Sequence, residues 1–295
     1  MLGSMLVDVL SRDSFLKITA TVRRQELARK CKERVPEADW VIFDAEAKDA
    51  EKALKNIEGN DWVINAIGLI RSNIHENNAH EVETAIRLNA LFPYLLARKT
   101  NSAGAKVLQI ATDCAFSGRK GGYTESDLFD PVDVYGKTKS LGEVCAADFF
   151  NLRTSIVGPV LSGHAGLLGW FLNQNKNARV DGYINHRWNG VTTLQFSKVC
   201  HGIINKKIKL SHVQHLVPSG ETTKYNLLQT FSKHYQREDI SVRPLKTPVA
   251  LDSTLKTDKI ALNLALWAAA GYGKPPTIAE MVAELANFNY RFAGL

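Results

Sequence analysis

Apolar positions in the first half of the chain form short continuous runs, separated by stretches in which they recur every three or four residues. The runs predict buried strands at Phe15–Val22, Trp40–Phe43, Trp62–Ile67 and Lys106–Ala111. The stretches between them predict helices at Gln25–Arg34, Ala45–Ile57 and Val82–Lys99. Strands that alternate with helices in this way are typical of a parallel sheet covered on both faces. The pattern therefore predicts an α/β fold with a doubly wound parallel sheet.

The second half of the chain has a less regular pattern. Strands are predicted at Asn151–Val157, Gln214–Pro218 and Ile240–Pro244, and helices at Ala165–Asn173, at Thr193–Lys206 and after the cap residue Thr277. We expect residues 1–158 to form a Rossmann-type dinucleotide-binding domain, to which about residues 190–220 return. Residues 159–189 and 221–295 are then expected to form a smaller C-terminal substrate-binding lobe.

The beginning of the chain departs from a doubly wound dinucleotide fold. Such folds open with a strand and a glycine-rich turn, whereas this chain runs from Gly3 straight into a predicted helix, Met5–Leu10. Because the first strand is central in that fold, Phe15–Val22 and Trp62–Ile67 would each have an unpaired edge without it. We therefore expect about ten further residues upstream, an apolar strand and the first glycines of the turn. The alternative is a chain that starts here and binds its dinucleotide weakly.

Composition narrows the class of protein. The chain has 295 residues, 45% hydrophobic and 23% charged, which are ordinary values for a soluble globular protein. The longest apolar runs, such as Leu264–Ala270, are far shorter than the roughly 20 residues that span a bilayer, and no signal peptide is visible. We therefore predict no membrane insertion.

Cysteines and charge exclude two further classes. The four cysteines have irregular spacing, which gives neither a disulfide framework nor a zinc site and predicts reduced thiols in a cytoplasmic protein. The net charge of +7 is scattered, with no basic stripe interleaved with aromatic residues. We predict no metal and no nucleic-acid partner, and the mild positive charge suits a phosphorylated small molecule.

The strongest candidate chemistry is a Y-x-x-x-K pair, Tyr135 and Lys139. On a helix these residues share one face, and a nearby ammonium lowers the pKa of a phenol so that it can act as a general acid. Thr112 follows the strand Lys106–Ala111, at the edge of the sheet where ligands bind. The alternatives are a surface tyrosine with a solvated lysine, and a turn made by Thr112 and Asp113.

These residues belong to a long ordered run of motifs. The run consists of A-T-D-C-A-F-S-G from Ala111, Y-T-E from Tyr123, and P-V-D-V-Y-G-K-T-K-S-L-G-E from Pro131. It resembles the dTDP-4-dehydrorhamnose reductases, which are extended short-chain dehydrogenase/reductases. The I-N-A segment at Ile64, the L-N-A segment at Leu88 and the R-T-S segment at Arg153 extend the resemblance over most of the chain, more weakly beyond Glu221.

The resemblance implies an NADPH-dependent reduction of the C4 ketone of a nucleotide-activated 4-keto-6-deoxy sugar, for surface polysaccharide synthesis. Tyr135 would protonate the ketone oxygen and Thr112 would hydrogen-bond the same oxygen. Lys139 would lower the pKa of Tyr135 and hold the nicotinamide ribose. Asn89 would support Lys139 or a nearby water.

The resemblance also implies how NADP is bound. Gly3 matches the last glycine of the phosphate turn, Asp44 and Ala45 flank the adenine, and Ala66 and Ile67 line the adenosine and pyrophosphate side. Arg23 and Arg24 follow the second strand of the fold, where an arginine accommodates a 2′-phosphate. The arginines favour NADP over NAD, and two ordinary surface arginines are the alternative.

For the nucleotide-diphosphate sugar, the resemblance implies substrate contacts at Asp113, Cys114, Arg153, Arg187 and Trp188. Arg187 would face the diphosphate and Trp188 the base or sugar, whereas a structural turn is the alternative there. Cys114 replaces the usual tyrosine of the family, and Ile156 stands where a tryptophan is common. Both departures leave the identity of the sugar open.

Two other functions stay open at this point. Some relatives bind NADP without catalysis and regulate a partner enzyme, although the intact Thr112, Tyr135 and Lys139 argue against that here. An epimerase or dehydratase on the same scaffold is the other alternative. Dehydratases usually carry an Asp-Glu pair after the threonine, and here Cys114 follows Asp113. A homodimer is compatible with the sequence, which does not give the oligomeric state.

Overall fold

The computed structural model describes residues 1–47, 50, 54–57, 59–161 and 166–294. The first half contains α1 (Leu2–Leu10), β1 (Thr19–Val22), α2 (Gln25–Arg34), β2 (Asp39–Ile42), η1 (Leu54–Ile57), β3 (Trp62–Asn65), η2 (Arg71–Asn73), α4 (Ala79–Ala85), the π-helical turn η3 (Ile86–Leu91), α5 (Phe92–Ala103), β4 (Lys106–Ala111), η4 (Asp113–Ala115) and α6 (Val134–Leu141). The second half contains β5 (Phe149–Arg153), β6 (Ile156–Val157), α7 (Gly166–Leu172), β7 (Arg179–Tyr183), β8 (His186–Trp188), β9 (Val191–Thr192), α8 (Thr193–Asn205), β10 (Val213–His215), β11 (Thr222–Thr223), α9 (Lys224–His234), β12 (Ser241–Leu245), β13 (Leu251–Asp252), α10 (Ile260–Ala269) and α11 (Ile278–Ala286).

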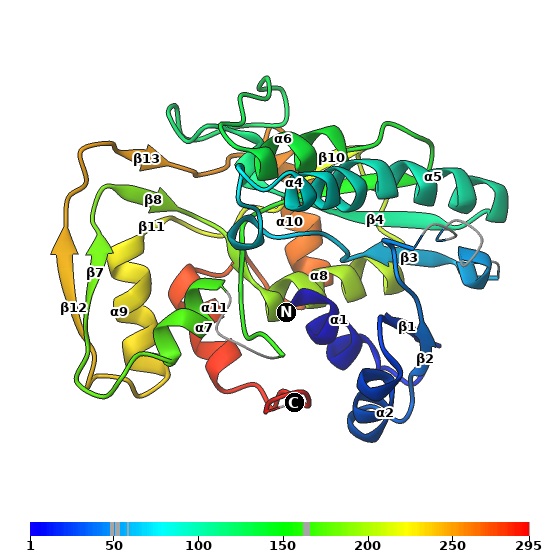
Figure 1. The fold of residues 1–295 in the computed structure, drawn as a ribbon, viewed down its shortest axis with the longest axis horizontal. Helices are drawn as coiled ribbons and strands as arrows, with labels where there is room; N and C mark the ends of the chain where they lie inside the picture. Colours follow the sequence, from blue (N-terminus) through cyan, green and yellow to red (C-terminus); the bar gives the residue numbers. More distant parts are fainter. Residues whose placement is uncertain (48–49, 51–53, 58, 162–165, 295) are drawn as a thin grey trace.

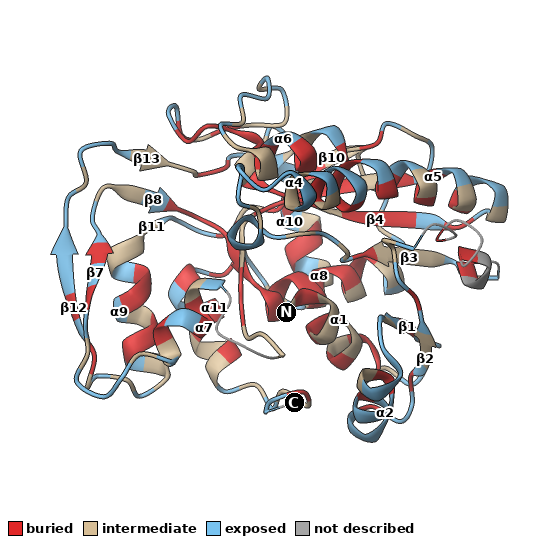
Figure 2. Cartoon of the chain, viewed as in Figure 1, coloured by how far each residue is buried: buried red, intermediate tan, exposed pale blue. Residues whose placement is uncertain are grey.

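The main sheet is parallel and has helices on both faces, which confirms the predicted α/β class. Its strand order is β10-β5-β4-β3, with α4, α5 and α6 on one face and α1, α8 and α10 on the other (Figure 1). β4 is largely buried, as its continuous apolar run predicts, whereas β12 in the C-terminal half is mostly exposed (Figure 2). The doubly covered sheet therefore brings the carboxyl ends of its strands to one edge, where the candidate site lies.

The parallel strands fall into two groups rather than one sheet. β1 pairs with β2, and β3 pairs with β4 at the edge of the four-stranded sheet. Among the described residues, no strand joins β1 to β3. The apolar face of α1 packs against α8.

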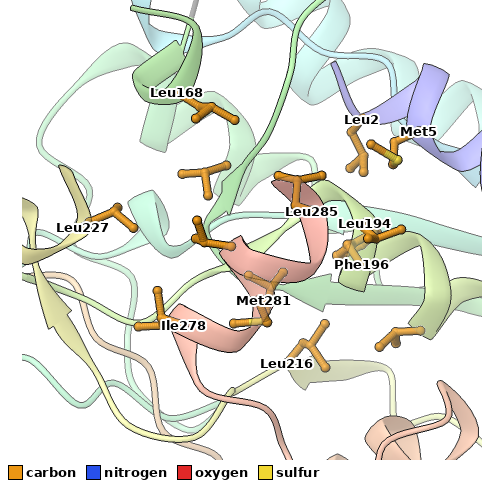
Figure 3. Close-up of a cluster of buried hydrophobic side chains, with 14 of the residues drawn as sticks. Leu2, Met5, Leu168, Leu194, Phe196, Leu216, Leu227, Ile278, Met281 and Leu285 are labelled. Atoms are coloured by element: carbon orange, nitrogen blue, oxygen red, sulfur yellow. The ribbon is translucent and has the colours of Figure 1, made fainter. Parts of the chain in front are cut away.

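Side chains from both halves of the chain form the largest core. Leu2 and Met5 of α1 lie near Leu194 and Phe196 of α8, and Met281 and Leu285 of α11 continue the cluster (Figure 3). Fully burying a side chain of this kind stabilises the fold by roughly 1.5–3 kcal/mol relative to leaving it exposed. The shared core ties the first helix to the last.

The C-terminal half carries small sheets and helices beside the main sheet. β7 pairs with β12, and β8 lies between β11 and β13 (Figure 1). α10 packs on α8 rather than with these small sheets, and Arg291 forms an ion pair with Asp8 of α1.

Several predicted elements differ in length. The predicted strand Asn151–Val157 divides into β5 and β6, because its last two residues pair with β9. In the predicted helix Ala45–Ile57, residues 45–47 form a turn and residues 54–57 a 3-10 turn, and residues 48–49 and 51–53 lie outside the described part. Thr277 caps α11 as predicted, in a capping box with Glu280.

Candidate active site

Thr112 lies directly after β4, at the carboxyl edge of the main sheet. Its side chain is 6% exposed and caps the short η4, where Oγ1 accepts a hydrogen bond from the backbone N–H of Cys114 at 3.2 Å. The hydroxyl is also 3.2 Å from Oδ1 of Asp113. The predicted turn made by Thr112 and Asp113 is therefore present, and it fixes the hydroxyl at the edge of the sheet.

Tyr135 and Lys139 lie on α6, one turn apart. Asp133 caps this helix by accepting a hydrogen bond from the backbone N–H of Gly136 at 2.8 Å. The side chain of Thr112 lies close enough to the phenol of Tyr135 to act on its pKa, so β4 and α6 bring the two hydroxyls near each other. Gly136 allows this approach, because a Cβ at that position would lie 2.2 Å from the carbonyl oxygen of Cys114.

The ammonium group of Lys139 is buried against the backbone of β4, and the net pKa shift of Tyr135 is upward. Its Nζ donates a hydrogen bond to the carbonyl oxygen of Ile110 at 2.6 Å, and burial lowers the pKa of Lys139 to about 8. Burial raises the pKa of Tyr135, and Cys114 and Asp113 raise it further. The pKa of Tyr135 is therefore raised overall in the chain alone, since desolvation dominates, and a lowering of this pKa by Lys139 stays a prediction.

Asn89 stabilises α6 from the side rather than through Lys139. It is 1% exposed in the π-helical turn η3, a rare form that is frequent at functional sites. Its Nδ2 lies 3.2 Å from Oγ1 of Thr138, and its amide exchanges hydrogen bonds with the backbone of Leu69 at 2.8 and 3.0 Å. Asn89 therefore links the segment after β3 to the residue beside Lys139.

The predicted cofactor residues follow the carboxyl ends of β1, β2 and β3. At Gly3, near the start of α1, an added Cβ would lie 3.8 Å from Cβ of Ala66, so this helix begins beside the end of β3. Ile67 is partly buried, and its backbone N–H donates to Oδ1 of Asn65 at 3.1 Å. Asp44 is exposed and Ala45 is partly buried after β2.

Arg23 and Arg24 are both exposed, directly after β1. The Nη1 atom of Arg23 lies 3.6 Å from a carboxylate oxygen of Glu46, and the side chain of Arg23 is 72% exposed. Such an exposed pair contributes little and can be replaced by a stronger anion. The guanidinium groups that follow β1 are therefore suited to bind a phosphate of a dinucleotide.

Arg153, a predicted substrate contact, is buried and paired with Glu143 in the structure, and its contact with substrate stays a prediction. Its side chain is 3% exposed and makes two 2.7 Å hydrogen bonds to the carboxylate of Glu143. A third contact joins it to Nε2 of His215 at 3.0 Å, and its guanidinium lies over Phe129 at 4.7 Å. In this structure the buried guanidinium of Arg153 is held by Glu143 and His215, which gives it a structural role.

Arg187 and Trp188, the other two predicted substrate contacts, also have partners within the fold. Arg187 forms ion pairs with Glu221 and, at 3.5 Å, with Asp252, so its charge is already balanced. Trp188 is 2% exposed within the largest core, which leaves its ring little access to a substrate. Its indole N–H has no hydrogen-bond partner among the described residues. Both residues lie on strand β8 rather than in a turn, and their contact with substrate stays a prediction.

Asp113 and Cys114 lie at the site, next to Thr112. Asp113 is 6% exposed, and burial raises its pKa while the charge of Lys224 acts in the opposite direction. Burial raises the pKa of Cys114 to about 12, and Asp113 adds to the increase. Cys114 is therefore a neutral thiol, which is a poor nucleophile.

The motif residue Glu125 has a structural role. One of its carboxylate oxygens accepts hydrogen bonds from the backbone N–H of His215 at 2.8 Å and from the hydroxyl of Thr257 at 2.7 Å. It therefore joins the segment between η4 and α6 to β10 and to the segment before α10. The Y-x-E motif holds the site together without belonging to it.

Two cations that sequence reasoning missed lie near Tyr135 or Asp113. Arg71 lines a small cavity of about 200 Å³ with Tyr135, and its Nε lies 2.7 Å from Oδ2 of Asp133. Lys224, the first residue of α9, acts electrostatically on Asp113. Neither cation belongs to a motif, because loop length and the packing of the C-terminal half decide where they lie.

No cluster of metal-ligating side chains occurs in the described ranges, and no described helix is long and apolar enough to cross a membrane.

The whole chain matches one family model. The model described as "RmlD substrate binding domain" matches residues 1–290. Among curated relatives, the dTDP-4-dehydrorhamnose reductase of Escherichia coli (strain K12) is 27% identical over 266 residues, 78% of this chain and 86% of that protein. The spore coat polysaccharide biosynthesis protein SpsK of Bacillus subtilis is 31% identical over 129 residues, which span 44% of its length. Methionine adenosyltransferase 2 subunit beta of Rattus norvegicus is 35% identical over 82 residues, 24% of its length.

Solved structures share the fold at low sequence identity. A dTDP-4-dehydrorhamnose reductase from Bacillus anthracis in complex with NADP superposes with a TM-score of 0.69 at 18% identity, covering 91% of this chain and 98% of that one. A UDP-glucuronic acid 4-epimerase from Bacillus cereus gives 0.74 at 13% identity, covering 97% and 95%. These likenesses show the fold, which the two enzymes share.

Proposed function

The chain belongs to the family described as RmlD substrate binding domain, and from this premise we propose that it reduces the C4 ketone of a nucleotide-activated 4-keto-6-deoxy sugar with NADPH. The observation that supports this most is the proximity of the Thr112 side chain to the phenol of Tyr135. Lys139, on the same helix as Tyr135, is hydrogen-bonded to the backbone of β4. Two hydroxyls held together can bind one carbonyl oxygen. The reductase from Escherichia coli and the NADP complex of its relative from Bacillus anthracis support the same assignment.

When bound, NADPH supplies the hydride. Thr112 would hydrogen-bond the ketone oxygen, which orients the carbon for reduction. Tyr135 would give its phenolic proton to that oxygen as negative charge develops there, and general acid catalysis of this kind contributes roughly 10²–10⁴-fold. The high pKa of Tyr135 keeps the phenol protonated in the chain alone. Lys139, 2.6 Å from the carbonyl oxygen of Ile110, would hold the ribose and then lower that pKa.

The cofactor would lie along the carboxyl edge of the parallel strands. Arg23 and Arg24 would bind its 2′-phosphate, and Asp44 and Ala45 would lie beside the adenine. Gly3, Ala66 and Ile67 would follow the adenosine and the pyrophosphate. Surface polysaccharide synthesis is the role we propose for the product, as the printed name of the SpsK relative suggests for that protein.

The test is NADPH consumption by the purified chain with a panel of dTDP- and UDP-linked 4-keto-6-deoxy sugars. We expect consumption with at least one of them and none with the same sugars lacking the nucleotide. Equal rates with and without the nucleotide would argue against a nucleotide-sugar enzyme. No consumption with any panel member would contradict the proposal.

A second candidate is a subunit that binds NADP without catalysis. The similarity to methionine adenosyltransferase 2 subunit beta favours it. The retained Thr112, Tyr135 and Lys139 speak against it, because a regulator does not need a proton donor. Binding of NADPH without consumption in the same panel would support this second function.

An epimerase or dehydratase is less well supported by the site. A dehydratase of this class needs a second acid after the threonine, and here the next residues are Asp113 and the neutral thiol of Cys114. Product analysis by mass spectrometry separates these reactions. A reductase adds two hydrogen atoms to the sugar, a dehydratase removes water, and an epimerase leaves the mass unchanged.

A further inference from the structure

The motif that begins at Pro131 ends with Gly142 and Glu143, which lie just beyond α6. The backbone N–H of Gly142 donates a hydrogen bond to the carbonyl oxygen of Thr138 at 3.1 Å, which closes the last turn. A Cβ at Gly142 would overlap the carbonyl oxygen of Asn89, so glycine is what lets this turn pack against η3. The side chain that follows, that of Glu143, is 4% exposed, and its carboxylate therefore lies inside the fold.

Arg153 of β5 fixes the carboxylate of Glu143. Its Nε and Nη2 atoms each donate a hydrogen bond of 2.7 Å to one carboxylate oxygen, and two parallel bonds of this kind set the position of the group as well as its orientation. Arg153 pairs with Ala111 in the register of β5 and β4. The negative charge of Glu143 is therefore held near the end of β4, which Thr112 follows.

Lys139 brings its ammonium group to the same end of β4. It lies four residues before Glu143, and its Nζ donates a hydrogen bond to the carbonyl oxygen of Ile110 at 2.6 Å. The charge of Glu143 favours the ammonium form of Lys139, whereas burial acts in the opposite direction and lowers the pKa of Lys139 to about 8. The loss of one neighbouring charge therefore changes how much of Lys139 is protonated near neutral pH.

The other ionisable groups around this lysine face elsewhere. α6 packs against α4, η3 and η4. The ionisable side chains of these four elements, apart from Tyr135 and Lys139, are His80, Glu81, Glu83, Arg87, Asp113, Cys114, Asp133 and Lys137. Those of α4 and η3 are exposed or partly exposed, as is Lys137, and those of η4 and Asp133 act on Tyr135. Among the described residues, Glu143 is therefore the carboxylate that acts on Lys139.

We propose that Glu143 is a positioning residue of the reductase, which Arg153 clamps so that a negative charge stays beside Lys139 and keeps it an ammonium group. The inference rests on the proposed function for what Lys139 does, namely to hold the ribose of the dinucleotide. The position of the charge itself rests on the contacts of Glu143 and Arg153. A carboxylate that only tied α6 to β5 would stabilise the fold without affecting the titration of Lys139.

The experiment is an NMR titration of the full chain, labelled with carbon-13 at Cε of its lysines, in the absence of NADPH. The signal of Lys139 is the one that disappears in Lys139→Gln, and its midpoint is expected at about pH 8. Glu143→Gln keeps the shape of the side chain without its charge, so the midpoint should fall by about one pH unit, the lower end of what an opposite charge contributes. Glu143→Asp keeps the charge, so the midpoint should fall much less.

The same shift is expected in catalysis. Because Lys139 must be charged to hold the ribose, NADPH consumption should be lost as the pH rises through the pKa of Lys139. In Glu143→Gln this loss should occur about one pH unit lower, while the rate at lower pH is largely retained. A purely structural role of Glu143 would reduce the rate by the same factor at every pH, and that result would overturn the inference.

Glu83→Gln is the matched control, because Glu83 is an exposed carboxylate that also pairs with an arginine, and it should leave the midpoint of Lys139 unchanged. If melting curves show that Glu143→Gln does not fold, the double variant Glu143→Gln, Arg153→Met replaces it, since losing both partners of a buried pair costs less than losing one. The midpoint should fall in that variant too. An unmoved midpoint, or an equal fall in Glu83→Gln, overturns the inference. A lowered midpoint in a chain that reduces no ketone would support the charge assigned to Glu143 while contradicting the proposed function.

Discussion

The catalytic edge and the cofactor edge of this molecule are built differently, although both follow the carboxyl ends of parallel strands. At the catalytic edge, Thr112 and Lys139 are at least nine-tenths buried, and hydrogen bonds hold each of them. At the cofactor edge, Arg23 and Arg24 are exposed, and β1 and β3 belong to separate sheets. The residues proposed for catalysis are therefore held within the fold, whereas the arginines proposed to bind NADP lie at its surface.

The largest effect is expected at the catalytic edge. Tyr135→Phe removes the phenolic proton and keeps the ring, so the rate of NADPH consumption should fall by roughly 10²–10⁴-fold while NADPH affinity stays within a few-fold. Steady-state rates and a fluorescence titration of NADPH measure the two quantities. Tyr94→Phe, on the exposed side of α5, is the control. A variant at Tyr135 with near-normal turnover would show that another group supplies the proton.

The next largest effect is expected for the buried ion pair between Arg153 and Glu143. Arg153→Met leaves Glu143 buried and unpaired, and losing one partner of a buried ion pair costs about 3–5 kcal/mol of unfolding free energy. The two side chains are 3% and 4% exposed, so solvent does not screen the loss. Denaturant unfolding measures it.

Arg243→Met provides the contrast for Arg153. Arg243 pairs with Asp181 at 2.7 Å, but the two side chains are 61% and 40% exposed. Loss of an exposed pair costs at most about 1 kcal/mol. Equal losses for the two variants would contradict the structural role assigned to Arg153.

The smallest effect is expected at the cofactor edge. The double variant Arg23→Ala, Arg24→Ala should reduce the preference for NADPH over NADH by roughly tenfold, because one charge-assisted contact to the 2′-phosphate is lost or weakened. The ratio of kcat/KM for the two cofactors measures this preference. Arg29→Ala, an exposed position on α2, should leave it unchanged. An unchanged ratio in the double variant would mean that the arginines are ordinary surface residues.

Much of the first half could be predicted from the sequence. The continuous apolar run Lys106–Ala111 coincides with β4, and the helical pattern of Gln25–Arg34 coincides with α2. Each pattern has the period of one kind of element, so both bounds are predicted to the residue. The proximity of Thr112 and Tyr135 could be expected from the resemblance. The family's motifs place the first residue directly after β4 and the second on α6, which packs beside that strand.

The substrate side could not be predicted in the same way. Arg153, Arg187 and Trp188 are the residue types that bind a nucleotide sugar, but type does not reveal whether a side chain is already paired or buried. Glu143, ten positions before Arg153, and Asp252, far along the chain, decide that. Lys224 gives no signal in sequence because α9 reaches Asp113 only through the packing of the C-terminal half.

The most direct test of the central claim is the transfer of deuterium from NADPH doubly deuterated at C4 of the nicotinamide. The account predicts a sugar product one mass unit heavier than with ordinary NADPH, with the deuterium on C4 of the sugar, and no such product from Tyr135→Phe at comparable times. A reduced sugar without deuterium, or oxidation of the cofactor without a reduced sugar, would contradict it.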